Sequence, residues 1–346
     1  MKNLKLIICI LIILFKTGNL FSDNNIFNVN NIEINKDISD KNEDLANLAF
    51  KNGFKELTNR LLLEKDFENV SSTSLEVIKT LISYYQIIEN NNKDKNNNLN
   101  INIFFDKDKI HNFFYQRNIL YSDVKNSEVL FFPLLIYKDE YLVYSKNYFY
   151  DNWIKNDQKN LIQYVLPVES IESIQSIELN KNTIFELNIS NFFKEYNNEN
   201  MTFAIIEKND NEAKIFLINS VSDKKLNKTL IVKREKLNQQ NFNDKIILDT
   251  KKIIKDLIKS QNLIDVRTPS FLNVELKINR KNNLFELGNR LSQIDLIETF
   301  YIQKLTKDYA FVKIKYLGKV TKIIDKLKKE KINLKMKNGQ WQISII

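Results

Sequence analysis

The segment Val129–Tyr137 constrains the fold more than any other part of the chain. It is an almost unbroken apolar run, VLFFPLLIY, that lies between the charged residues Glu128 and Lys138. Such a run is typical of a strand that is buried on both faces of a sheet. Because proline cannot donate a ladder hydrogen bond, we expect Val129–Phe132 to form the paired part of a central strand and Pro133 to mark the point where the chain leaves the sheet.

The amino-terminal segment has the pattern of an export signal. Two lysines precede an apolar stretch of roughly ten residues, from Leu6 to Phe15, and a polar segment then leads to Ser22. We therefore predict a signal peptide over residues 1–22, cleavage near Ser22 and a protein of the periplasm. A bilayer-spanning helix needs about 20 apolar residues, so an uncleaved leader that anchors the chain in the inner membrane is kept as the alternative.

Cysteine content and charge give further constraints. The only cysteine, Cys9, lies inside the leader, so the expected mature chain has no disulfide and depends on its core for stability. The chain has 52 Lys and Arg against 43 Asp and Glu, and its net charge of +9 falls to +6 without the three lysines of the leader. This mild charge specifies no partner by itself.

Three small mixed α/β modules are predicted, over residues 23–125, 126–268 and 269–346, which places the chain in the α+β class. In the first module, apolar residues at three- and four-residue spacing from Leu45 to Leu61 predict a long helix that packs on a sheet. Gly53 within this helix indicates a close approach of its backbone to a neighbour.

Two strands are predicted later in the same module, over Tyr84–Glu89 and Leu99–Phe105, joined by the polar loop Asn90–Asn98. A helix is predicted near Leu75 before them, and another runs from Ile110 after them. His111, the only histidine of the chain, is expected at the surface of that second helix.

The middle module starts with the central strand and continues with an aromatic stretch, expected as a short strand and a helix. The next elements are predicted as a strand, a helix, three strands and a helix: Leu161–Leu166, Ile184–Phe193, Met201–Glu207, Lys214–Asn219, Lys228–Val232 and Asp244–Lys259. A mixed sheet with helices packed on it would bury all of their apolar faces.

The C-terminal module has the clearest pattern. It is predicted as strand, helix, two strands, helix and strand: Leu272–Ile278, Leu284–Ile294, Ile297–Leu305, Tyr309–Tyr316, Val320–Leu327 and Ile332–Met336. The pair Asn338-Gly339 then predicts a hairpin to a last strand, Trp341–Ile345. The order is βαββαβ, a ferredoxin-like unit, with an added edge strand.

Two sets of residues are candidate binding surfaces. The first is aromatic and could stack on sugars or clamp a peptide, with ordinary packing as the alternative: Tyr141, Tyr144, Tyr148 and Trp153. The second is basic and could contact an anionic membrane surface or peptidoglycan, with a solvated helix face as the alternative: Lys322, Lys326 and Lys329.

Few residue patterns indicate catalysis. One histidine and no cysteine in the mature chain leave no Cys/His metal site, and the isolated glycines form neither a nucleophile elbow nor a phosphate loop. We expect no catalytic residue, metal or cofactor. Hydrolysis by a pair of carboxylates stays open, because two acids can come together from anywhere in a sequence.

Nucleic acid is not an expected partner. The segment Lys307–Ile314 resembles the third-strand signature of RNA-recognition domains, which share the C-terminal topology. However, Asp308 stands in place of a glycine, and Leu272–Ile278 lacks the aromatic residue that would stack a second base.

The overall pattern resembles a family of secreted bacterial proteins, domain-of-unknown-function family 2066. The segments that carry the resemblance are mostly apolar and span nearly the whole mature chain: Leu45–Leu63, Asn102–Asp106, Ile110–Arg117, Val129–Pro133, Trp153, Leu291–Leu305, Ala310–Gly318 and Leu327–Trp341. The middle module is more distantly similar to the amino-terminal domain of TolB and to related envelope domains. The resemblance implies protein-binding modules rather than catalysts, and no functional residue follows from it.

Together, these patterns predict a non-catalytic exported adaptor or scaffold that binds envelope proteins. The alternatives are an envelope glycan-binding protein and a carboxylate-dependent hydrolase.

Overall fold

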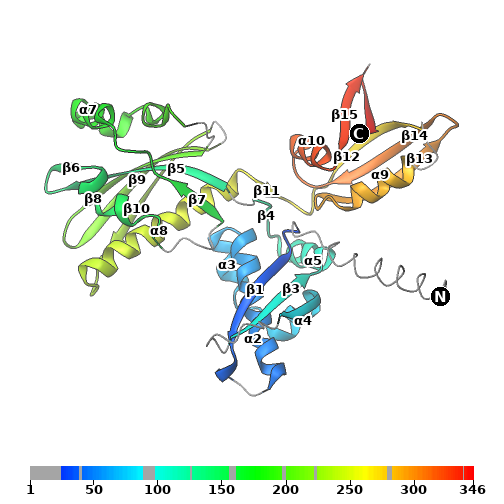
Figure 1. Ribbon diagram of the computed structural model, residues 1–346, viewed down its shortest axis with the longest axis horizontal. Helices are drawn as coiled ribbons and strands as arrows, with labels where there is room; N and C mark the ends of the chain where they lie inside the picture. The colour runs from blue at the N-terminus through cyan, green and yellow to red at the C-terminus, as the bar shows by residue number, and fades with distance from the viewer. Residues whose placement is uncertain are drawn as a thin grey trace, which may run out of the picture. The chain divides into compact units, whose positions relative to one another are not determined.

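The computed structural model describes residues 25–38, 41–88, 98–124, 127–155, 161–196, 200–221, 224–278, 283–337 and 339–346. The predicted leader and loop residues 90–97 lie outside these ranges. The chain contains helices together with several small β-sheets, which confirms the α+β class (Figure 1). No helix in the described ranges is long and apolar enough to cross a membrane.

The chain divides into two units. The first contains the described residues up to Thr58 together with Val70–Leu120 and Ile264–Ile346, and the second contains Asn59–Asn69 and Tyr121–Leu263. The three domains expected from the sequence stay a prediction.

The first unit contains a three-stranded antiparallel sheet of order β1-β3-β2, with β1 (Asn28–Asn35), β2 (Ile82–Ile88) and β3 (Asn98–Phe105). Its other elements are η2 (Lys36–Ile38), α2 (Asn42–Leu61), α4 (Leu75–Leu81) and α5 (Lys107–Arg117). A Cβ at Gly53 of α2 would lie 2.5 Å from Cδ1 of Ile103 on β3. The close approach expected at Gly53 is therefore confirmed.

The same unit contains a five-stranded sheet of order β13-β14-β12-β16-β15. Its elements in chain order are β12 (Ser270–Lys277), α9 (Asn283–Ser292), β13 (Ile297–Leu305), β14 (Tyr309–Tyr316), α10 (Val320–Lys329), β15 (Ile332–Lys337) and β16 (Gln340–Ile345). The last hairpin turns at Gly339, which has a φ of +76°. The added strand is not at the edge: β16 pairs in parallel with β12, and β15, whose Lys335 and Lys337 suit an edge, lies outside it.

The second unit is built on a six-stranded mixed sheet of order β10-β9-β8-β5-β6, with β7 also paired to β5. The strands are β5 (Ser127–Tyr137), β6 (Glu140–Leu142), β7 (Ile162–Val165), β8 (Asn200–Lys208), β9 (Glu212–Val221) and β10 (Lys224–Lys233). The helices are α3 (Glu64–Val70), η3 (Tyr144–Lys146), α6 (Tyr148–Asn152), α7 (Ile171–Leu179), η4 (Lys181–Glu186), η5 (Ile189–Phe193) and α8 (Gln239–Ser260). The two-residue strands β4 (Tyr121–Ser122) and β11 (Leu263–Ile264) form a separate small sheet.

Strand β5 is buried on both faces, as its apolar run predicts. Side chains on one face of β5, among them Phe131, pack in one cluster with α8. Those on the opposite face, among them Phe132, pack in a second cluster with α7 and η5. Figure 1 shows α8 and α7 on opposite sides of the sheet. The central strand therefore separates two hydrophobic cores.

The expectation that the chain leaves the sheet at Pro133 was wrong, because β5 continues to Tyr137 and Pro133 lies opposite Ala204 of β8. On its other side, β5 pairs with β7 as far as Leu130 and with β6 only from Leu135 onward, so Pro133 lies in the gap between these two partners. In that gap the carbonyl of Pro133 accepts a hydrogen bond from Nδ2 of Asn147, at 2.9 Å. The missing N–H of proline costs no ladder bond there.

The segment between β7 and β8 also differs from expectation. The predicted continuous helix over Ile184–Phe193 is two short 3-10 segments, η4 and η5, because Leu187 and Asn188 have non-helical backbone angles. The helix α7, begun by the side-chain cap of Ser170, was not predicted at all. These three elements form the surface considered next.

Candidate binding sites

The aromatic set predicted as one surface is divided between the two cores. Trp153 is fully buried against Phe131, with ring centroids 3.8 Å apart, in the cluster under α8. Tyr144 is also buried, in the cluster under α7, where burial raises the pKa of its phenol. Tyr141 and Tyr148 are half-buried. The expectation of an accessible ring therefore fails for Tyr144 and Trp153, because both fill core space beside β5.

The three predicted lysines lie on α10 but do not all face solvent. Lys326 forms an ion pair with Asp295, with Nζ and Oδ1 2.5 Å apart. Lys322 is half-buried, and Lys329 is exposed at the C-terminal end of the helix, where a positive charge is favoured. Local structure thus accounts for Lys326 and Lys329.

His111 is buried rather than exposed, which corrects the expectation for this residue. Its Nδ1 lies 3.0 Å from Oε1 of Glu298, and its ring contacts Phe27 edge to face. The hydrogen bond from His111 lowers the pKa of Glu298. This pair lies inside the first unit, and we assign it to the packing of α5.

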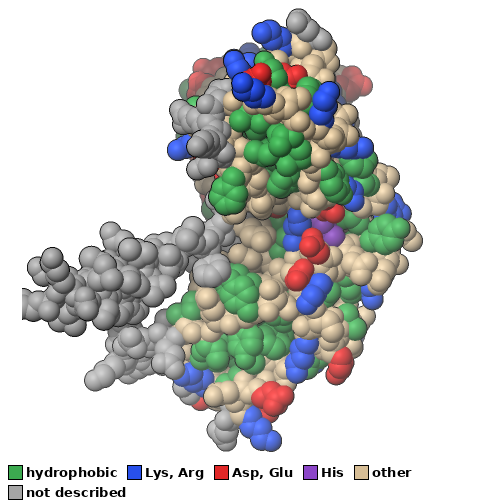
Figure 2. Space-filling view, turned by 90° about the vertical axis from the view of Figure 1, so that its right-hand side faces the viewer, with side chains coloured by type: hydrophobic (Ala, Val, Ile, Leu, Met, Phe, Trp, Pro, Cys, Tyr) green, Lys and Arg blue, Asp and Glu red, His purple; other side chains and the backbone are tan. Residues whose placement is uncertain are grey.

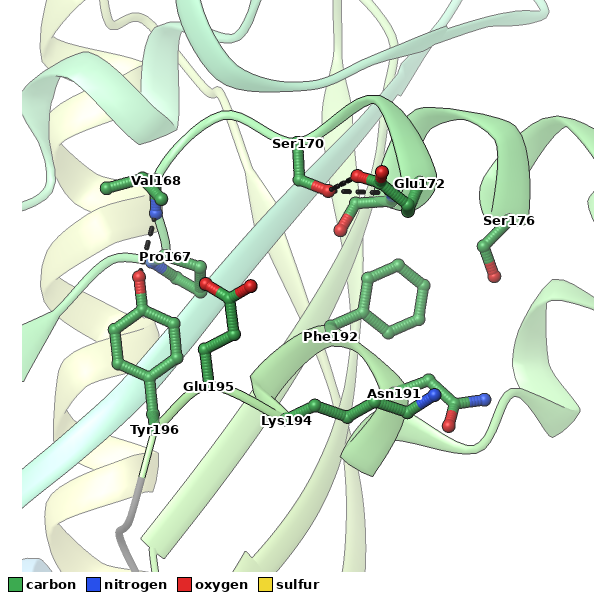
Figure 3. Close-up of a pocket in the computed structure, with 11 residues that line it drawn as sticks. Pro167, Val168, Ser170, Glu172, Ser176, Asn191, Phe192, Lys194, Glu195 and Tyr196 are labelled. Carbon is green, nitrogen blue, oxygen red and sulfur yellow. Dashed lines mark hydrogen bonds between the residues drawn. The ribbon is translucent and has the colours of Figure 1, made fainter.

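A polar groove lies beside α7 in the second unit, with a volume of about 340 Å³. One wall is the face of α7 that carries Ser170, Ser173 and Ser176. The other wall is η5 and the residues after it, with Asn191 and Glu195 among them. Figure 3 shows Glu195 and the ring of Phe192 pointing toward the space between the two walls.

Glu172, which lines the groove, does not have the electrostatics of an acid catalyst. A glycosidase acid needs a raised pKa so that it is protonated near neutral pH. The pKa of Glu172 is instead lowered, first by a hydrogen bond from the hydroxyl of Ser170, which lies 2.7 Å from Oε2. Among the described residues, no group of three or more His, Cys, Asp or Glu could hold a metal ion.

Strand β2 forms a second candidate surface, in the first unit. Within the described ranges it is an edge strand, hydrogen-bonded to β3 on one side, and every residue of the strand after Ile82 is exposed. Tyr85 contacts Phe50 of α2 edge to face, and a hollow lies beside the two rings. Ile87 and Ile88 are 45% and 36% exposed. Hydrophobic side chains do gather in patches on a visible face of the molecule, as Figure 2 shows.

The composition of β2 differs from that of the other edges. Its sequence, ISYYQII, contains no charged residue and no proline. In the part of the chain that the structure describes, every other edge strand either has four residues or fewer or carries a charge, such as Glu33 of β1, Lys228 of β10, Lys304 of β13 and Lys335 of β15. Proteins protect free edges in these two ways.

Both surfaces had a signal in the sequence. An uncharged, strand-forming ISYYQII could have been recognised as an unprotected edge once its place in the sheet was known. The three serines at three-residue spacing mark one face of a helix. The helix α7 itself was missed, so that face was missed too.

Comparison with known proteins gives no further information about these surfaces. No family model, curated protein or solved structure that was compared with the chain matches it.

Proposed function

We propose that this chain is an exported, non-catalytic envelope protein that binds a partner protein by pairing an extended segment of the partner with β2. The observation that carries the proposal is the long, apolar and uncharged edge of β2. An open edge offers backbone N–H and C=O groups to an added strand, and side chains on both faces give specificity.

The leader pattern up to Ser22 supports export to the periplasm, with retention by an uncleaved leader as the alternative. The resemblance to domain family 2066 and to TolB-like envelope domains belongs to the same proposal. It supports protein binding as the mode of action.

Two features make β2 suited to a partner. Tyr84 stacks on Phe104 of β3, with ring centroids 4.2 Å apart, and Tyr85 contacts Phe50, so the start of the strand is held on both faces. The later residues Ile87 and Ile88 have large exposed fractions. An incoming strand would bury apolar surface without a large loss of order in β2, which favours affinity.

The test is photo-crosslinking in living cells. A photoreactive residue replaces Ile87 in the tagged full chain, and the matched control carries it at Ile231, which is 59% exposed on the lysine-rich edge strand β10. We expect a discrete conjugate with one protein from position 87 and none from position 231. The conjugate should form equally at high salt, because backbone pairing and apolar contacts are little screened.

The variant Ile87→Lys provides the second arm. It adds to β2 the charge that the other long edges carry, so the partner should no longer be captured while the melting temperature stays unchanged. Equal crosslinking from both positions, or capture that Ile87→Lys leaves intact, would contradict the proposal.

A further inference from the structure

The groove beside α7 has fixed walls. The hydroxyl of Tyr196 accepts a hydrogen bond from the backbone N–H of Val168, at 3.0 Å, and the hydroxyl of Tyr150 donates to the carbonyl of Pro167, at 2.8 Å. Ser170 caps α7 by accepting from the N–H of Ser173. Figure 3 shows the first of these bonds at one end of the groove and the Ser170 contacts at another. The segment that leads into α7 is therefore held in place before any ligand arrives.

Several polar side chains of the groove are uncommitted. In the described part of the chain, the side chains of Ser176, Asn191, Lys194 and Glu195 have no hydrogen-bond partner, although all four line the groove. They offer a hydroxyl, an amide, an ammonium and a carboxylate, so donors and acceptors are both present. Phe192 lies between them, and its ring is buried against Phe132 and Phe203, so the groove offers a ligand mainly polar groups.

We propose that this groove binds a neutral saccharide of one or two rings. A sugar ring presents several hydroxyl groups that both donate and accept hydrogen bonds, which matches a groove whose walls offer uncommitted donors and acceptors without a strong net charge. The volume of about 340 Å³ is near the lower end of the about 300–1,000 Å³ of small-molecule sites. This inference is independent of the proposed function, because the groove and β2 belong to different units.

Other ligand classes fit less well. Glu172 and Glu195 oppose a phosphate or an acidic sugar, since only Lys194 among the groove residues is positive. A lipid chain would leave the serine and asparagine groups without partners, which is unfavourable. A cationic peptide is the remaining rival, because the carboxylates would attract it, and the experiment separates it from a sugar.

The experiment is saturation-transfer NMR of the full chain with chitobiose and with maltose, followed by titration to obtain Kd. The double variant Ser176→Ala with Asn191→Ala removes two groove groups. The control is Ser190→Ala with Asn182→Ala, which makes the same chemical changes at exposed positions that do not line the groove. Melting temperatures of both variants verify that they fold.

We expect at least one disaccharide to bind, and about a tenfold weaker Kd for the groove variant from the loss of two hydrogen bonds. The control should bind as the wild type does. Absence of binding at millimolar sugar, or equal Kd values for the groove variant and the wild type, would overturn the proposal. It would also be overturned if tetralysine bound in place of the sugars and was lost in Glu172→Gln with Glu195→Gln.

Discussion

At the scale of single residues, Lys259 of α8 is the most unusual group in the second unit. It is fully buried, and its Nζ donates hydrogen bonds to the carbonyl of Asn59, at 2.6 Å, and to the carbonyl of Leu62. These carbonyls lie at the C-terminal end of α2, where intrahelical partners run out. Lys259 thus caps that helix end by donating hydrogen bonds to its last carbonyls.

The pH dependence of stability tests this arrangement. Burial lowers the pKa of Lys259 from 10.5 to about 7. Between these values the unfolded chain binds more protons than the folded chain, so the free energy of unfolding should rise with pH, by at most about 1.4 kcal/mol per pH unit. In urea unfolding, the free energy of unfolding of Lys259→Met should no longer rise with pH over this range. The variant Lys252→Met, on the half-exposed face of α8, should retain the rise. An unchanged slope in Lys259→Met would contradict the assignment.

Sequence patterns could not have identified this cap. The carbonyl of Leu62 is 197 positions from Lys259, and a lysine in an amphipathic helix is usually solvated. The same holds for His111, whose partner Glu298 is 187 positions away. By contrast, the local periodicity of α2 and α8 predicted both helices, because burial of one face repeats every three or four residues.

At the scale of elements, the packing of α2 on β3 depends on Gly53. A Cβ there would be too close to Cδ1 of Ile103, which is fully buried. Gly53→Ala should therefore lower the free energy of unfolding, although alanine favours a helix by about 1 kcal/mol over glycine.

The control for this prediction is the same substitution in an Ile103→Val background, which lacks Cδ1. There Gly53→Ala should be neutral or stabilising, although Ile103→Val alone costs about 0.5–1.5 kcal/mol. Denaturant unfolding of the four chains measures both effects. An equal cost of Gly53→Ala in both backgrounds would show that the close approach is not what requires glycine.

The bounds of β5 and the presence of α7 were not predictable from sequence patterns. The apolar run at Val129 predicted a strand buried on both faces. Its end was predicted wrongly at Pro133, because the sequence does not show that Pro133 lies in the gap between β6 and β7. Likewise, α7 has exposed apolar residues such as Ile171 and Leu179, so its periodicity is weak. Tyr144 and Trp153 could not be assigned to a core or a surface until their neighbours were known.

At the scale of the whole molecule, the two candidate surfaces lie in different units. An exposed apolar edge in the first and a polar groove in the second would let one chain hold a protein strand and a small ligand at once. An adaptor of the proposed kind would use both surfaces.

Hydrogen exchange of the β2 amides tests the central claim most directly. The chain is measured alone and in complex with the protein captured through Ile87. We predict that the amides of β2 that do not pair with β3 become protected in the complex, while those of the edge strand β10 exchange at an unchanged rate. Unchanged exchange across Ile82–Ile88 in the complex would show that no strand is added to β2.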